Sequence, residues 1–139
     1  MKGLRLYKKE KLCSTTAIDN LFARGRDVSG ALEYPLRAVW RLNPQRRSDA
    51  SMAFVVSVPK KRLHHAVDRV AMRRRIRESY RLSRLDYPLA AGIKVDVAFI
   101  YVADTLRPYA LIARAMNNLL AEIRQSLMED NIDDDGKQE

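Results

Sequence analysis

A chain of 139 residues, 47% of them hydrophobic, is long enough to bury one core, and no apolar run in it approaches the roughly 18–20 residues of a membrane span. The single cysteine excludes a disulfide framework or a thiolate metal cluster within one chain. The net charge is +9, but residues 129–139 carry six acids and one lysine, so the remaining 128 residues carry +14. We therefore expect one domain over 1–128 that binds a polyanion, with nucleic acid favoured over an anionic membrane or an acidic protein, and a disordered acidic tail over 129–139.

The first predicted element is a short helix over 15–25, with the sequence TTAIDNLFARG. Thr16 and Asp19 have the spacing of a capping box, and Gly25 suits the end of a helix. The apolar residues of this helix fall on one face: Ile18, Leu21 and Phe22. The basic segment before it is not followed by an apolar signal core, so we expect a cytoplasmic protein with no membrane partner.

Strands are predicted next. Residues 32–42 alternate between apolar and polar side chains after Pro35, and 52–59 contain a four-residue apolar run that indicates burial on both faces. The clearest alternation lies in 93–102. A long helix over about 66–84 separates the last two strands, which permits them to pair in parallel, and a final helix follows Pro108.

The order is helix, two or three strands, helix, strand, helix. This order predicts an α+β protein, a two-layer α/β sandwich in which three helices pack on a sheet of about four strands.

The helix over 66–84 is the most informative element, because seven arginines lie between residues 64 and 84. On a helical projection Met72, Ile76 and Tyr80 form a narrow apolar stripe, while Glu78 and Asp68 lie on the far side. One flank carries the arginines Arg69, Arg73, Arg74, Arg77 and Arg81. Like charges four residues apart repel by a few tenths of a kcal/mol per pair, about 0.2–0.5. The arrangement suits bidentate hydrogen bonds to phosphate oxygens, and Lys60, Lys61 and Arg62 add charge where the helix begins.

No set of residues in the chain indicates catalysis. The carboxylates form no close pair in sequence, and no glycine-rich phosphate loop exists, so we predict no catalytic residue. His64 and His65 are adjacent and do not share a helical face, so we expect phosphate contact or solvation rather than a metal site. We interpret Cys13 as a small residue near the start of a helix. It is not expected to be a catalytic nucleophile, because nothing in the sequence places an imidazole beside it.

Three blocks resemble the bacterial ribonuclease P protein component, in order, over about residues 4–125: FARGRDVSG, VVSVPKKRLHHAVDRVAMRRRIRESYRL and DVAFIYV. The middle block is the specific one. The residues that match the family motif are Lys60, Lys61, Ala66, Val67, Arg69, Arg73, Arg74, Ile76, Arg77 and Glu78. Val70 and Ala71 stand where the family usually has Asn and Arg, and Ile18 replaces the first of two aromatic residues in the first helix.

The resemblance implies a protein that partners a large catalytic RNA and assists removal of the 5′ leader of precursor tRNA. The RNA and its Mg²⁺ ions would perform the hydrolysis, without a dedicated metal site on the protein. It also implies a left-handed βαβ crossover. We expect the free protein to be a monomer. The residues expected to contact the RNA subunit are Lys60, Lys61, Arg62, Arg69, Arg73, Arg74, Arg77 and Arg81. A cleft between the first helix and the sheet would hold the leader through Phe22, Tyr34 and Arg37.

Alternatives remain open at this point. Phe22 and Tyr34 also fit plain core or edge packing. A structural RNA-binding protein of the ribosomal type, with no role in cleavage, has a similar fold and charge. A DNA-binding regulator that uses 66–84 as a recognition helix fits less well, because no compact helix–turn–helix precedes that segment.

Overall fold

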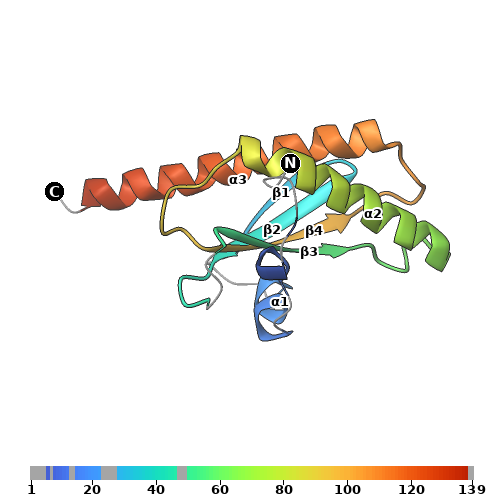
Figure 1. The fold of residues 1–139 in the computed structure, drawn as a ribbon, viewed down its shortest axis with the longest axis horizontal. Helices are drawn as coiled ribbons and strands as arrows, with labels where there is room; N and C mark the ends of the chain where they lie inside the picture. Colours follow the sequence, from blue (N-terminus) through green and yellow to red (C-terminus); the bar gives the residue numbers. More distant parts are fainter. Residues whose placement is uncertain (1–5, 7, 13–14, 23–27, 47–49, 138–139) are drawn as a thin grey trace.

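The computed structural model describes residues 6, 8–12, 15–22, 28–46 and 50–137 (Figure 1). Its elements in chain order are η2 (Lys8–Glu10), α1 (Thr15–Phe22), β1 (Ser29–Glu33), β2 (Leu36–Leu42), β3 (Met52–Ser57), α2 (Ala66–Ser83), η3 (Arg84–Asp86), β4 (Val95–Tyr101) and α3 (Tyr109–Lys137). The predicted class and order of helices and strands are confirmed. None of the helices in this part of the chain is both long enough and apolar enough to cross a bilayer.

The four strands form one mixed sheet in the order β1-β2-β4-β3. β1 and β2 form an antiparallel hairpin, and β2 also pairs antiparallel with β4. β3 and β4 are parallel and are joined through α2, which is the crossover unit that the sequence predicts. The single strand predicted over 32–42 is in fact two strands. Tyr34 and Pro35, joined by a cis peptide, form the turn between them, because proline supplies no N–H to a ladder.

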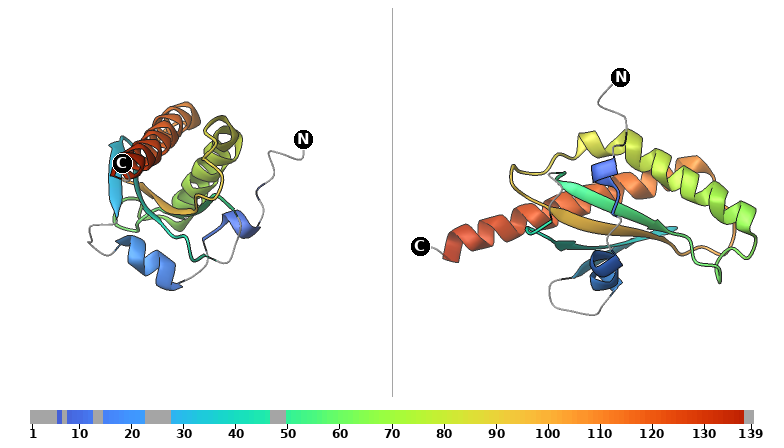
Figure 2. Two further views of the ribbon diagram at one scale, coloured as in Figure 1. Left: turned by 90° about the vertical axis from the view of Figure 1, so that its left-hand side faces the viewer. Right: turned by 60° about the horizontal axis from the view of Figure 1, so that its bottom comes forward.

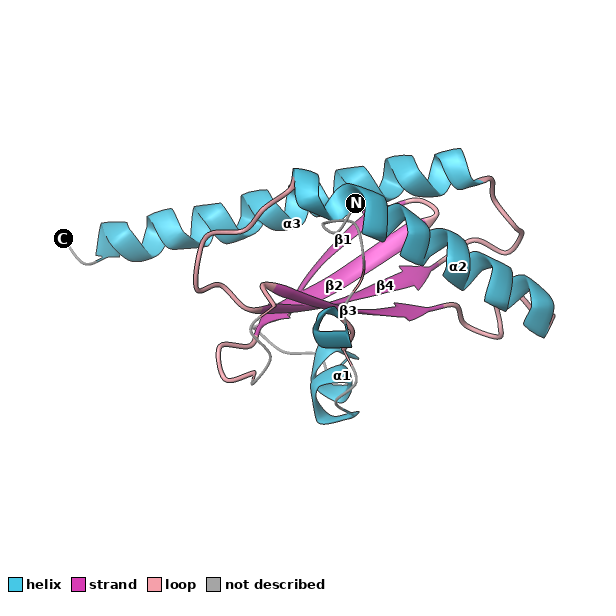
Figure 3. Ribbon diagram, in the orientation of Figure 1, coloured by secondary structure: helices cyan, strands magenta, loops and turns pink. Residues whose placement is uncertain are grey.

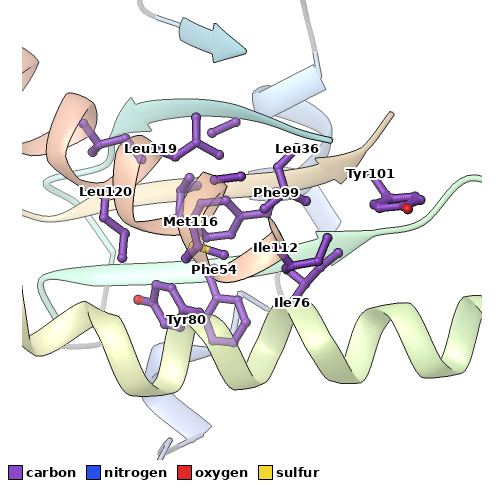
Figure 4. Close-up of a cluster of buried hydrophobic side chains, with 14 of the residues drawn as sticks. Leu36, Phe54, Ile76, Tyr80, Phe99, Tyr101, Ile112, Met116, Leu119 and Leu120 are labelled. Carbon is purple, nitrogen blue, oxygen red and sulfur yellow. The ribbon is translucent and has the colours of Figure 1, made fainter. Parts of the chain in front are cut away.

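Helices cover both faces of the sheet. α2 and α3 lie on one face and α1 lies on the other, as the two views in Figure 2 and the colouring of Figure 3 show. The larger core lies under α2 and α3, where β4 contributes Val97, Phe99 and Tyr101 (Figure 4). Ala98, the alternate residue of β4, instead packs with Leu21 of α1 in a smaller cluster on the opposite face. Because successive side chains of β4 point to opposite faces of the sheet, this one strand contributes to both hydrophobic clusters.

The apolar stripe predicted for α2 is confirmed. Met72 and Ile76 are fully buried and Tyr80 is 1% exposed. These side chains recur every four residues and so project from one side of the helix onto the sheet. Because the stripe is narrow, most of the circumference of α2 is left for charged side chains.

The acidic segment at the end of the chain differs from the disordered tail that its composition predicts. α3 continues as helix to Lys137 and extends beyond the edge of the sheet (Figure 1). Once a helix is nucleated, each further residue adds one backbone hydrogen bond, so a helix held by a buried amphipathic half can extend into a polar sequence.

Candidate RNA-binding surfaces

The turn before α2 presents its lysines to solvent. The backbone N–H groups of Arg62 and Leu63 donate to the Pro59 carbonyl, at 3.0 and 3.3 Å, and the Leu63 side chain is buried. Lys60 and Lys61 project from this turn and are exposed. The anchored Leu63 therefore fixes where the two ammonium groups stand relative to α2.

Arg69 helps to hold that turn against the helix. One of its guanidinium nitrogens, Nη1, donates to the carbonyl oxygens of Leu63 and His64, each at 2.9 Å. His65 is the N-cap and gives no side-chain cap, so Arg69 links the first turn of α2 to the residues before it. This predicted RNA contact is thus also a positioning residue.

We call Arg73, Arg74 and Arg77, together with Lys60 and Lys61, the basic face of α2. Arg74 and Arg77 are exposed and Arg73 is partly exposed. Among the residues that the structure describes, none of these five has a hydrogen-bonding or ion-pair partner for its side chain. Five cations that lack protein counter-ions on one surface form a site for a polyanion.

Two of the predicted contacts are engaged within the protein. Arg81 bonds the Glu78 carboxylate three residues earlier, with Nε to Oε2 at 3.1 Å. This hydrogen bond lowers the pKa of Glu78, so the pair stays charged. Arg62 pairs with the exposed Asp104 at 3.1 Å. Residues three apart are neighbours on a helix, which is why Glu78 reaches Arg81 although the projection places it away from the other arginines.

The face of the sheet that carries α1 has an uncovered row, made of one residue from each strand. Strand register aligns Leu32 with Arg37, Arg37 with Ile100, and Ile100 with Ser57. We call these four residues the α1-side row. Leu32 is 65% exposed and Arg37 is exposed, while Ile100 packs against the cluster that contains Leu21. The row thus borders α1 and combines apolar surface with one guanidinium.

Phe22 ends α1 on this side of the sheet. Its ring is 49% exposed, whereas the preceding Leu21 is 1% exposed and carries the packing of α1. Core packing therefore does not account for Phe22, which leaves an aromatic surface beside a sheet face that carries a cation. An aromatic ring beside a cation suits single-stranded nucleic acid, which proteins bind by base stacking and by charge.

Residues 6–124 match the model of the Ribonuclease P family. The chain belongs to the ribonuclease P protein family. Ribonuclease P protein components of two Porphyromonas gingivalis strains, ATCC 33277 and W83, are each 36% identical to it over 121 residues, covering 85% of this chain and 85% of each relative. The Staphylococcus aureus RNase P protein has a similar fold, with a TM-score of 0.64 over 82% of this chain and 94% of that one, at 15% identity.

Membership in the ribonuclease P protein family carries a general role in tRNA 5′ processing and identifies the class of enzyme, an endoribonuclease complex, in which the chain takes part. Fold and family, as predicted from the sequence, are both confirmed. The individual RNA contacts remain predictions.

Tyr34, the third predicted leader contact, does not belong to the α1-side row. It is in the β1–β2 turn, where its hydroxyl accepts a hydrogen bond from Arg107 at 3.0 Å, and the Arg107 guanidinium lies 5.6 Å from the ring centroid. Arg107 belongs to the segment before α3, and its carbonyl accepts a hydrogen bond from Arg75 of α2 at 2.7 Å. Arg75 therefore points toward the start of α3 and not onto the basic face.

A buried polar cluster that was not predicted from the sequence forms around Asp96 of β4. Asp96 is 1% exposed and accepts hydrogen bonds from Asn43 at 2.8 Å and from Arg46 at 2.5 Å. Arg46 also donates to the Val95 carbonyl at 3.1 Å and to that of Ala50. The cluster ties the β2–β3 loop to β4. The sequence gives a weak signal for it, a charged residue in the middle of an apolar strand.

Proposed function

We propose that this chain is the protein subunit of ribonuclease P, which assists a catalytic RNA in removing the 5′ leader of precursor tRNA. The observation that carries the proposal is the basic face of α2, which lacks counter-ions within the described protein, in a chain of this family. The free protein is proposed to be a cytoplasmic monomer.

The basic face is assigned to the RNA subunit. Duplex RNA is recognised mainly through its backbone and shape, and guanidinium groups spaced along a rigid helix suit phosphate contacts. The full proposed set is Lys60, Lys61, Arg62, Arg69, Arg73, Arg74, Arg77 and Arg81. Within this set we expect Arg73, Arg74 and Arg77 to contribute most, because Arg69 and Arg81 already donate to groups of the protein.

The leader is assigned to the opposite face, beside α1. Phe22 offers a ring for stacking and Arg37 a charge for phosphate, and the α1-side row adds the apolar Leu32 and Ile100. Tyr34 would extend this surface at the end of the hairpin. These residues bind and orient, and they screen phosphate repulsion so that less Mg²⁺ is needed.

Magnesium is assigned to the RNA and the substrate. In the described part of the chain, no group of three or more His, Cys, Asp or Glu side chains is placed to hold a metal ion. We therefore derive no step through a protein-bound metal.

The deciding experiment is cleavage of precursor tRNA by the catalytic RNA at low magnesium, with and without this protein. We expect the protein to restore cleavage at the correct position. Absence of rescue, with tight RNA binding retained, would favour a structural RNA-binding role of the ribosomal type.

Replacing Phe22 with alanine tests the leader site. We expect affinity for precursor tRNA to fall by about fivefold to 100-fold, the range of one lost base–aromatic stack, while affinity for mature tRNA changes little. Fluorescence-anisotropy titrations of both tRNAs with the reconstituted complex measure this difference. Leu42→Ala is the matched control, because Leu42 is 46% exposed but belongs to the other face of the sheet. Equal losses for the two tRNAs would remove Phe22 from the leader site.

A further inference from the structure

A cavity of about 380 Å³ lies outside both proposed RNA surfaces. It is open to solvent on one side, and its lining comes from η2, the start of β3, the C-terminal end of α2, the segment that follows and one residue of α3. Its principal walls are Glu10, Met52, Tyr80, Arg84, Leu89 and Leu120. Pockets that bind small molecules have volumes of about 300–1,000 Å³ and are mostly apolar with a few directed polar groups.

The Tyr80 hydroxyl is the notable polar group of this cavity. Tyr80 is 1% exposed, and its ring packs on Phe54 and Phe99 with centroid distances of 4.3 and 5.7 Å. The hydroxyl forms no hydrogen bond with any residue that the structure describes, and in Figure 4 it lies at the end of the ring away from Ile76. The hydroxyl oxygen itself is not sealed from solvent, because Tyr80 lines the pocket. A ligand acceptor can therefore reach it and take the place of water.

The Tyr80 hydroxyl is a donor at neutral pH. Burial raises the pKa of Tyr80 well above its usual range, with a further contribution from the nearby Glu10 carboxylate. The phenol therefore stays protonated, and it suits an acceptor such as a ring nitrogen or a carbonyl oxygen.

An ion pair forms the other polar wall. Arg84 Nε lies 2.6 Å from Glu10 Oε1, and the two side chains are 8% and 15% exposed. Because the two charges offset each other, the cavity is not built to hold an ion. Apolar walls with a neutral donor and a fixed carboxylate and guanidinium suit an uncharged heterocycle that carries both donors and acceptors.

The basic face of α2 leads to this cavity. Arg77 and Arg84 are seven residues apart, two helical turns along the same flank, and Lys9 is exposed at the cavity's lining. Two helical turns span roughly 10 Å, so a phosphate backbone that follows the arginines would reach the cavity with a nucleotide farther along and not with the next one. Because these cations lie near the cavity, we expect its ligand to carry a phosphate, as a nucleotide does and an uncharged metabolite does not.

We infer that the cavity binds a nucleobase, specifically one unstacked base of an RNA whose backbone lies on α2. The base accepts the Tyr80 hydrogen bond and packs on Met52, Leu89 and Leu120, while its phosphate stays outside. Unstacking a base costs a few kcal/mol, about the cost that burial in a fitted pocket offsets. The assignment of this base to an RNA on α2 rests on the proposed function, whereas binding of a base in the cavity can be tested on the free protein without any cleavage.

The first test is an NMR titration of the isotope-labelled full chain with the four nucleoside 5′-monophosphates, ribose 5-phosphate and inorganic phosphate. We expect saturable shift changes at Tyr80, Leu89 and Leu120 with at least one mononucleotide, and none there with ribose 5-phosphate. Shifts confined to the arginines of α2, or equal shifts with ribose 5-phosphate, would overturn the inference.

Variants then locate the ligand. Tyr80→Phe keeps the ring and should lower mononucleotide affinity by about two- to tenfold, the effect of one hydrogen bond. Ser51→Trp should abolish binding, because Ser51 is exposed and lines the cavity. Ser29→Trp is the matched control on β1, at an exposed serine outside the cavity. Wild-type binding by Ser51→Trp, in a variant with an unchanged thermal melt, would disprove the site.

The source of the base needs a separate measurement. If the base belongs to RNA, Ser51→Trp should also weaken binding of the catalytic RNA, whereas Ser29→Trp should not. Loss of mononucleotide binding with unchanged RNA affinity would show that the cavity serves a free nucleotide and would overturn the assignment to RNA. Failure of low-magnesium rescue in the cleavage assay would leave these results unaffected.

Discussion

Replacing Arg73 and Arg77 together with alanine is expected to weaken binding of the catalytic RNA by at least about tenfold at moderate salt. The two guanidinium groups lie one turn apart on α2, and among the described residues no counter-ion competes with phosphate for them. Each phosphate contact contributes about 0.7–0.9 to the slope of log affinity against log salt, so the slope should become shallower by at most about two units. Binding titrations at four or five salt concentrations measure both quantities.

The control removes the same charge elsewhere. Arg114 and Arg124 both belong to α3, so the double variant Arg114→Ala with Arg124→Ala lowers the net charge equally. Because Arg124 Nε also donates to the Pro88 carbonyl at 2.8 Å, Arg114→Ala alone is measured beside it. We expect these α3 variants to change affinity only through the general field of the protein, with little change in slope. If the α2 variant keeps the wild-type slope, the basic face does not touch phosphate.

Removing the Asp96 carboxylate is expected to have the largest effect on stability. Asp96→Ala leaves the Arg46 guanidinium, whose side chain is 10% exposed, without its carboxylate partner inside the protein. Breaking one side of a buried ion pair costs about 3–5 kcal/mol, and the β2–β3 loop loses its tie to β4. Urea denaturation followed by circular dichroism should show a lower midpoint.

Asp104→Ala is the matched control, because this carboxylate also pairs with an arginine but is 76% exposed. Exposed pairs contribute about 0–1 kcal/mol, so its denaturation midpoint should stay close to that of the wild type. Similar midpoints for the two variants would show that the buried cluster contributes no more than a surface pair does.

The features that could be predicted from the sequence are those set by local periodicity. Met72, Ile76 and Tyr80 recur at helical spacing, so both the helix and its buried side follow from the chain alone. The alternation in 93–102 likewise predicts a strand, which the structure places over Val95–Tyr101. The basic face of α2 follows from the same projection, since the arginines lie on a flank outside the narrow buried stripe.

The features that could not be predicted depend on contacts between distant segments. The α1-side row joins Arg37, Ile100 and Ser57 through the register of three strands, which no single segment encodes. The cavity beside Tyr80 draws its walls from five parts of the chain. The ion pair between Arg81 and Glu78 also could not be predicted. It depends on the side-chain rotamers, which a helical projection does not give.

The placement of α1 and α2 on opposite faces of the sheet would separate the two RNA strands that we propose to bind there. Each packed layer adds about 10 Å, so the outer surfaces of the two helices stand more than about 20 Å apart. The Debye length in physiological salt is about 8 Å. Two polyanionic strands, one on each side, would therefore stand farther apart than this length, and the salt in the solvent around the protein would screen most of the repulsion between them.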